Sequence, residues 1–335
     1  MAKVKLATKV DSDVLVVGVG ISNSKLQILS GISEVDSTAL LINLNAIGAT
    51  GKVDEVIKLP GKTTKLIVFT GLGKIESNFS PELLRRAAGA AARELAGNKS
   101  AAFALPHKSV IELSAIAEGA ALGAYSFTQF LGSSKKEQKD PLSTVSVITK
   151  FADTPAAKAA ARRAEIIAEQ TFLVRDLINT PPSHLTPDSF CLRMKKEAAK
   201  YGVKVEIIND AALKKGGYGG IIGVGQGSAN PPRLLHVTYS PAKAKKRYAF
   251  VGKGITFDTG GLALKPAAGM EAMKADMSGA AAVIAAVFAI AQLKLPIAVD
   301  GWAPLAENMV SDSATRPSDV ITIYGGKTVE VLNPD

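Results

Sequence analysis

The chain has 335 residues, of which 47% are hydrophobic, 5% aromatic and 21% charged, and this composition excludes disordered and fibrous proteins. Lysine and arginine number 40 against 30 aspartates and glutamates, which gives a net charge of +10. The basic runs have no interleaved aromatic residues on which nucleic-acid bases could stack, so we expect solvated surface and keep a nucleic-acid partner as an alternative. The single cysteine, Cys191, excludes an internal disulfide framework and a cysteine-based zinc site.

The N-terminal half alternates apolar runs with a helical pattern, which predicts an α/β domain. Ser80–Gly97 is predicted to be a helix, because Ser80 suits the N-cap and Pro81 suits the first helical position. The candidate strands are Val14–Val19, Ala39–Asn45, Lys65–Thr70 and Leu142–Thr149.

Three glycine-rich stretches, at 18–20, 71–73 and 223–227, partly resemble dinucleotide-binding loops. None continues to a further glycine that opens a helix at the required spacing, so the full fingerprint is absent. We expect the first two to be turn glycines and the third to be a loop.

The C-terminal half is also predicted to be α/β. Thr154–Ile178 has the pattern of one long helix that the prolines at 181–182 end, and Thr186 is expected to cap the next helix. The candidate strands are Val203–Ile208, Leu234–Tyr239, Tyr248–Val251, Ile297–Ala303 and Thr328–Leu332. We predict an N-terminal domain at 1–152, a linker helix at 153–180 and a second domain at 181–335.

No segment predicts a membrane protein. The longest apolar run, Ala280–Ala291, is shorter than the roughly 20 residues that span a bilayer, and it is expected to be a buried helix. The N-terminus lacks the apolar core of a signal peptide. We therefore expect a cytoplasmic protein without membrane contact.

The segment 252–276 carries the chemistry, because it combines lysines and aspartates around a glycine-rich turn that follows an apparently buried strand. Asp258, Asp276 and the more distant Asp335 could converge on hard cations, although Asp258 could instead shape a turn and Asp276 could cap a helix. Lys253 could ligate a metal as a neutral amine, and Lys265 could stabilise an oxyanion. The neighbouring Lys274 and the three scattered histidines have no such pattern and are assigned to structure or surface.

Several long motifs resemble the leucyl (cytosol) aminopeptidase family of two-metal exopeptidases. The likeness is carried by GKGITFDTGG, LKP and MKADMSGAA within 252–281, by RDLINTPPSHLTPDSF at 175–190, and by APLAENMVSDSATRPSDVITIYGGKTVEVLN at 303–333. It implies an N-terminal α/β domain similar to macro domains, a C-terminal α/β two-metal peptidase domain that is incomplete in this chain, and a homo-hexamer.

The resemblance also implies roles for individual residues. Lys253 and Asp276 would bind one metal, Asp258 would bridge both metals, and Asp335 would bind the other. Lys265 would be the catalytic lysine. The substrate's first side chain would lie against Met273 and Asn333.

The implied activity is removal of N-terminal residues, with a leucine-type preference, from peptides with a free N-terminus during intracellular protein turnover. The expected cofactors are two divalent ions, Mn²⁺ or Zn²⁺ first and Mg²⁺ or Co²⁺ as alternatives, with bicarbonate in a complete enzyme.

The match breaks at the end of the chain, where Asn333-Pro334-Asp335 stands in place of the start of the family's NTDAEGRL motif. The glutamate and arginine of that motif are absent. We expect the chain to be a fragment of a complete enzyme and to be inactive alone. The alternatives are a catalytically dead, basic DNA-binding or regulatory protein on the same scaffold and, through the N-terminal domain, a binder of ADP-ribose-type ligands.

Overall fold

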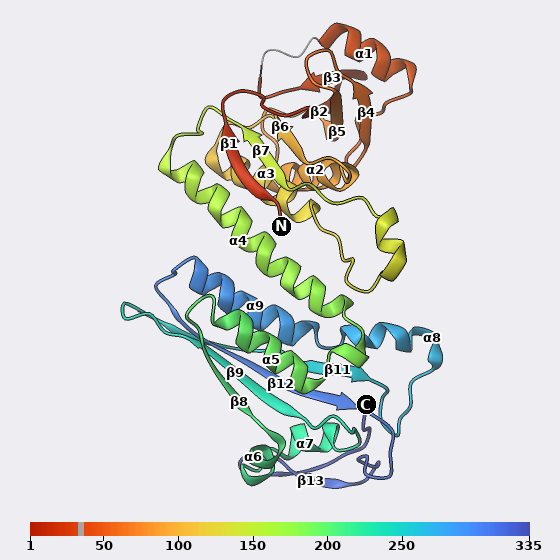
Figure 1. Ribbon diagram of the computed structural model, residues 1–335, viewed down its shortest axis with the longest axis vertical. Coiled ribbons are helices and arrows are strands. Elements are labelled where there is room, and N and C mark those ends of the chain that lie inside the picture. The colour runs from red at the N-terminus through yellow and green to blue at the C-terminus, as the bar shows by residue number, and fades with distance from the viewer. Residues whose placement is uncertain (33–36) are drawn as a thin grey trace. The chain divides into compact units, whose positions relative to one another are not determined.

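The computed structural model describes residues 1–32 and 37–335, which form two compact units, 1–169 and 170–335 (Figure 1). The division falls within the long helix α4 (Pro155–Asn179), so this helix contributes residues to both units. The predicted long helix is confirmed. The domain limits at 152 and 181 stay a prediction.

The N-terminal unit is built on one seven-stranded, mainly parallel sheet in the order β1-β7-β6-β2-β5-β4, with β3 pairing antiparallel to β2. Its strands are β1 (Lys3–Ala7), β2 (Val14–Ser22), β3 (Lys25–Leu29), β4 (Val56–Pro60), β5 (Leu66–Lys74), β6 (Ser100–Phe103) and β7 (Thr144–Ile148). Its other helices are α1 (Ser37–Ala46), α2 (Pro81–Glu94), α3 (Val110–Gly123) and the 3-10 turn η1 (Gly132–Glu137).

The central strand β2 is buried on both faces, as expected of a parallel sheet covered by helices. Val14 and Val16 belong to the core that includes α2 and α3, whereas Leu15, Val17 and Val19 belong to the core on the other face. The predicted α/β class of this unit is therefore confirmed. Ser80 caps α2 by accepting a hydrogen bond from the Leu83 N–H at 3.2 Å, as the sequence predicts.

Two predictions for this unit are wrong. Ala39–Asn45 lies in helix α1 rather than in a strand, because Leu40 and Leu44 share one helical face and pack against the sheet. The glycines at 18–20 and 71–73 lie inside β2 and β5, not in turns. At Gly71 a side chain is excluded, since a Cβ atom there would lie 1.7 Å from the Lys52 carbonyl oxygen.

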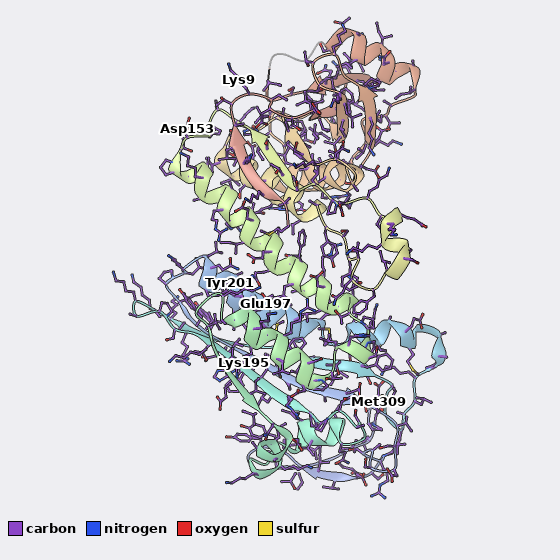
Figure 2. All side chains as sticks on the ribbon, viewed as in Figure 1. Lys9, Asp153, Lys195, Glu197, Tyr201 and Met309 are labelled. Carbon is purple, nitrogen blue, oxygen red and sulfur yellow. The ribbon has the colours of Figure 1, made fainter. Side chains whose placement is uncertain are left out.

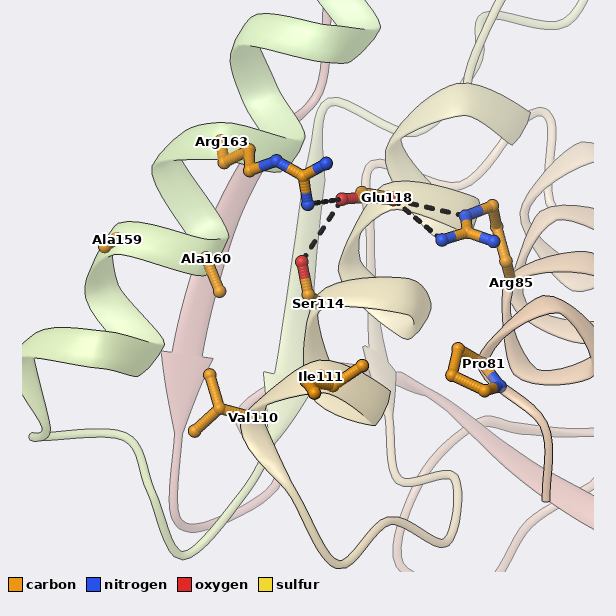
Figure 3. A pocket seen from close by; sticks show the side chains of 9 residues that line it. All are labelled: Pro81, Arg85, Val110, Ile111, Ser114, Glu118, Ala159, Ala160 and Arg163. Atoms are coloured by element: carbon orange, nitrogen blue, oxygen red, sulfur yellow. Dashed lines mark hydrogen bonds and ion pairs between the residues drawn. The ribbon is translucent and has the colours of Figure 1, made fainter. Parts of the chain in front are cut away.

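A buried acid joins three helices of the N-terminal unit. Glu118 of α3 accepts hydrogen bonds from Arg85 of α2 at 3.1 Å, from Arg163 of α4 at 2.7 Å and from Ser114 at 3.2 Å (Figure 3). The close approach of α2 to α3 depends on Gly119, where a Cβ atom would lie 2.0 Å from the Arg85 carbonyl oxygen. These side chains close one end of a pocket of about 320 Å³ between the three helices.

The C-terminal unit has a five-stranded mixed sheet in the order β10-β12-β9-β8, with β11 also pairing with β12, and a separate two-stranded sheet of β13 and β14. Its strands are β8 (Lys204–Ile208), β9 (Arg233–Tyr239), β10 (Arg247–Val251), β11 (Gly254–Asp258), β12 (Ala298–Asn308), β13 (Val320–Thr322) and β14 (Thr328–Glu330). Its helical segments are η2 (Pro182–His184), α5 (Pro187–Ala198), α6 (Asp210–Lys215), α7 (Gly219–Gly225), α8 (Ala267–Met270), η3 (Glu271–Ala275) and α9 (Ser278–Gln292).

The core of this unit lies between the sheet and helices α5 and α9. Tyr201, labelled in Figure 2, places its ring 5.4 Å from that of Phe288 in α9. Thr186 caps α5 as predicted, with the Ser189 N–H 3.3 Å from its hydroxyl. The α/β class is confirmed for this unit too.

Three expectations for the C-terminal unit need correction. The stretch 223–227 is not a simple loop, because its first three residues complete helix α7. The strand at Tyr248–Val251 is present as β10, but all its residues are exposed, since it lies at the sheet's edge. Lys274 is only half-exposed and donates to the Asn179 carbonyl oxygen at 3.4 Å.

The segment Ala267–Gln292 is long and apolar enough, by length and composition, to cross a membrane. Its helix is interrupted near Gly269, whose φ is +88°, and the remaining α9 packs into the core of the C-terminal unit. A core helix passes the same length and composition test, so this segment is not enough to suggest a membrane span.

Candidate metal centre

Asp258 is positioned by a strand that sequence reasoning did not identify. Strand β11 runs parallel to β12, and its last residue, Asp258, pairs with Asn308 at the end of β12. One carboxylate oxygen of Asp258, Oδ1, accepts from the Gly260 N–H at 2.8 Å and from Asn308 Nδ2 at 3.0 Å. The other oxygen, Oδ2, lies 3.2 Å from Lys265 Nζ. Asp258 thus shapes the turn and also presents an oxygen toward a cation.

The surroundings favour the ionised form of Asp258. Burial alone would raise the pKa of Asp258, but hydrogen bonds from Gly260, Lys265 and Asn308 outweigh it and hold this pKa below its ordinary value. Asp258 is therefore a buried carboxylate at neutral pH.

The turn after β11 returns Lys265 to the carboxylate. Gly260 and Gly261 have φ of +85° and +60°, a region that favours glycine. The Lys265 N–H donates to the Thr259 carbonyl oxygen at 2.9 Å, which closes the turn. The Lys265 ammonium then forms ion pairs with both Asp258 and Asp335.

Lys265 is held as an ammonium. Burial alone would lower the pKa of Lys265, but its hydrogen bonds to Asp335 and Asp258 raise this pKa above the ordinary value. The side chain therefore carries a proton at neutral pH and can donate it in hydrogen bonds.

Asp276 lies just before α9 but does not cap that helix, whose N-cap is Met277 with no side-chain bond. Lys253 Nζ forms an ion pair with Asp276 Oδ2 at 2.8 Å, yet this buried oxygen accepts no hydrogen bond of suitable geometry. Burial raises the pKa of Asp276, the neighbouring charge of Asp258 adds to the rise, and the Lys253 ammonium opposes it. A buried carboxylate, Asp258, and a half-buried one, Asp276, thus lie next to each other, each paired with a lysine.

This arrangement fits a hard divalent cation, because carboxylate oxygens are its preferred ligands and the buried Oδ2 of Asp276 has an ion pair but no well-aligned hydrogen bond. Lysine is the basic side chain that can lose its proton and ligate through nitrogen. Among the described residues no three His, Cys, Asp or Glu side chains group as metal ligands. Asp335 is joined to Asp258 through Lys265.

The two expected substrate-binding residues lie beside these ligands in the chain. Met273, in η3, is half-exposed, and its carbonyl oxygen accepts from the Asp276 N–H at 3.2 Å. Asn333 is exposed, and its side-chain oxygen accepts from the Asp335 N–H at 2.9 Å. Both contact the backbone of a proposed ligand, and their role toward substrate stays a prediction.

Comparison with known proteins places these residues in a family. The model of the cytosol aminopeptidase family's catalytic domain matches residues 172–335, and that of its N-terminal domain matches residues 14–134. A probable cytosol aminopeptidase of Streptomyces coelicolor is 47% identical over 97% of this chain and 67% of its own length. One from Streptomyces avermitilis is 48% identical over 98% of this chain and 68% of its own length.

Solved structures agree with the sequence relatives. The bottromycin maturation enzyme BotP in complex with Mn matches with a TM-score of 0.80 and 33% identity over 96% of this chain and 66% of that chain. The cytosol aminopeptidase of Coxiella burnetii matches in fold with a TM-score of 0.76 and 23% identity, over 99% of this chain and 66% of that chain. The present chain thus spans about two thirds of the length of these proteins, and it belongs to the cytosol aminopeptidase family.

Proposed function

We propose that this chain carries the metal-binding part of an aminopeptidase site, in which Lys253, Asp258, Asp276 and Asp335 hold two divalent ions. The observation that carries the proposal is the pair of adjacent carboxylates, buried Asp258 and half-buried Asp276, each of which is paired with a lysine of the same segment. Relatives named cytosol aminopeptidases and a structural neighbour solved with Mn support it.

The bound ions would supply Lewis-acid polarisation of a carbonyl and a water of lowered pKa. The chain's own contribution is positioning and proton placement. Lys265, held protonated beside Asp258 and Asp335, would donate a hydrogen bond to the carbonyl oxygen that gains negative charge during cleavage. Lys253 would need to lose its proton to ligate through nitrogen, and the charge of a bound dication, rather than the neighbouring Asp276 carboxylate, would favour that loss.

The proposed substrates are peptides with a free N-terminus and a leucine-type first residue, with Met273 and Asn333 against that residue. A role in protein turnover in the cytoplasm, a homo-hexamer, a preference for Mn²⁺ or Zn²⁺, and bicarbonate in a complete enzyme are part of the same proposal. They rest on the motif resemblance and, for location and metal, on the names of the relatives and of the Mn-containing neighbour. No comparison supports the alternative of a catalytically dead DNA-binding protein.

Mn²⁺ binding to the chain, followed by calorimetry, tests the site directly. We expect Asp258→Asn and Asp276→Asn to weaken binding by more than the about 10–100-fold that loss of an outer partner costs. Asp300→Asn is the matched control, because Asp300 is a buried acid of the same sheet that pairs with Arg247 instead. A wild-type chain that binds no Mn²⁺, or variants that bind it equally well, would contradict the proposal.

Leucine anilide hydrolysis separates binding from catalysis. We expect no hydrolysis by the 335-residue chain, because the glutamate and arginine of the family motif are absent from its sequence. Mn²⁺-dependent hydrolysis by this same chain would show that those residues are dispensable.

A further inference from the structure

Asn308 is a buried polar side chain to which the motif resemblance assigns no role. It ends strand β12, and 5% of its surface is exposed. Its amide nitrogen Nδ2 donates to Asp258 Oδ1 at 3.0 Å and to the Pro334 carbonyl oxygen at 3.1 Å. One side chain therefore connects Asp258 to the backbone next to Asp335.

The surrounding backbone is arranged around this amide. Thr259 donates to the Asn308 carbonyl oxygen through both its N–H, at 3.0 Å, and its hydroxyl, at 2.9 Å, which fixes the end of β12 against the turn. Gly261 leaves the space that the side chain needs, since a Cβ atom there would lie 2.9 Å from Asn308 Oδ1. Asn308 is thus packed in one orientation, with its donor toward the carboxylate.

This orientation decides which oxygen of Asp258 is available. The Gly260 N–H and Asn308 Nδ2 both donate to Oδ1, so that oxygen's two lone pairs are engaged. Oδ2 is left facing Lys265, which also pairs with Asp335. Without Asn308 the carboxylate could rotate about its last bond, and Pro334 would lose the donor that ties it to β12.

We propose that Asn308 is a positioning residue of the metal centre: it fixes the Asp258 carboxylate with Oδ2 toward the ligand cluster and ties the backbone beside Asp335 to the same strand end. The proposal rests on the proposed function, because it assumes that Asp258 and Asp335 are ligands. Outer partners of this kind orient ligands and contribute about 10–100-fold to metal affinity.

The test is Mn²⁺ calorimetry on the chain with Asn308→Leu, a substitution of similar volume that removes the amide. We expect binding about 10–100-fold weaker than wild type. Asn230→Leu is the matched control, because Asn230 Nδ2 also donates to a carboxylate of β12, Glu307, at 2.9 Å but does not contact Asp258. It should bind Mn²⁺ as wild type does.

The outcomes separate the two proposals. If wild type binds no Mn²⁺, the proposed function fails and this inference fails with it. If wild type binds and Asn308→Leu binds equally well, the metal site stands and the role of Asn308 is wrong. Equal weakening in Asn230→Leu would also overturn it, because any lost amide bond near β12 would then suffice.

A measurement on the wild-type chain covers the case in which Asn308→Leu does not fold. With asparagine labelled in ¹⁵N, a titration with Zn²⁺, which is diamagnetic and does not broaden signals through space, should shift the side-chain amide signals of Asn308 more than those of Asn230, because Asn308 and not Asn230 bonds to the proposed ligand Asp258. Equal shifts of the two amides, or none at either, would overturn the inference.

Discussion

Each unit of the molecule contains a buried acidic site, and the two sites are stabilised in different ways. Glu118 in the N-terminal unit is bonded to two arginines and a serine. Asp258 and Asp276 in the C-terminal unit lie beside each other and are paired with lysines. Arginine cannot give up its proton in a protein, whereas a lysine beside other cations can. The first site is suited to holding helices together, whereas in the second Lys253 would give up its proton to ligate an ion while Lys265 stays protonated.

The two sites also differ in how well their carboxylate oxygens are hydrogen-bonded. Both oxygens of Glu118 accept hydrogen bonds. By contrast, Oδ2 of Asp276 is buried against the Lys253 ammonium in an ion pair of poor hydrogen-bond geometry, and the charge of Asp258 helps to raise the pKa of Asp276. A carboxylate that is poorly hydrogen-bonded and lies beside a second negative charge lowers the stability of the fold. Such a cost is usual where a functional site is placed inside a fold.

The largest expected effect is therefore on the N-terminal site. Glu118→Gln should destabilise the N-terminal unit by about 2–4 kcal/mol. This loss lies at or below that expected for breaking a fully buried ion pair, because both arginines are partly exposed. Arg163→Met, which leaves Glu118 bonded to Arg85, should cost about 1 kcal/mol or less. Hydrogen exchange of peptides from α2 and α3 measures both.

Cys191 provides the matching probe in the other unit. It is fully buried in the core of the C-terminal unit, and burial raises its pKa to about 12, so its thiol should react only when that core opens. Glu118→Gln should leave the labelling rate of Cys191 unchanged. Faster labelling in that variant would show that the two units unfold together, and the comparison between them would fail.

The features that could be predicted from the sequence are those that depend on residues close together in the chain. Ser80 and Thr186 cap their helices through residues three positions away, and both caps are legible in the sequence. Helix α1 could not be predicted in this way. The pattern of Ala39–Asn45 also fits a strand, and the helix is favoured because it packs Leu40 and Leu44 against the distant sheet.

The candidate site shows the same limit. The lysines and aspartates of 253–276 were identified from their local motif, and the structure brings Lys253 to Asp276 and Lys265 to Asp258. Asn308 lies 50 residues from Asp258 in the chain, and it was missed because only the pairing of β11 with β12 brings the two together. Its sequence signal was its place in the motif at 303–333, but the strand there was predicted to end at Ala303, five residues before Asn308.

The next effect in size concerns the metal. At a free Mn²⁺ concentration of 100 times the dissociation constant, binding to the folded chain alone should stabilise it by about 2.7 kcal/mol. We expect this to appear as slower labelling of Cys191 and unchanged hydrogen exchange in α2 and α3. Protection of α2 and α3 without protection of Cys191 would place the ion in the wrong unit.

The smallest effect is expected from Asp276→Asn in the metal-free chain. Since burial and Asp258 raise the folded-state pKa of Asp276 above its ordinary value of 3.8, the folded state binds this proton more tightly than the unfolded state does. Stability from this group is then fully present below pH 3.8 and declines as pH rises through the folded-state pKa. Asp276→Asn should remove that decline and leave stability at pH 7 unchanged or higher, by about 1 kcal/mol or less. Cys191 labelling with and without the substitution, from below pH 3.8 up to pH 7, measures it. A clear loss of stability would mean that Asp276 serves the fold as Glu118 does, and the contrast between a structural acid and a functional one would not hold.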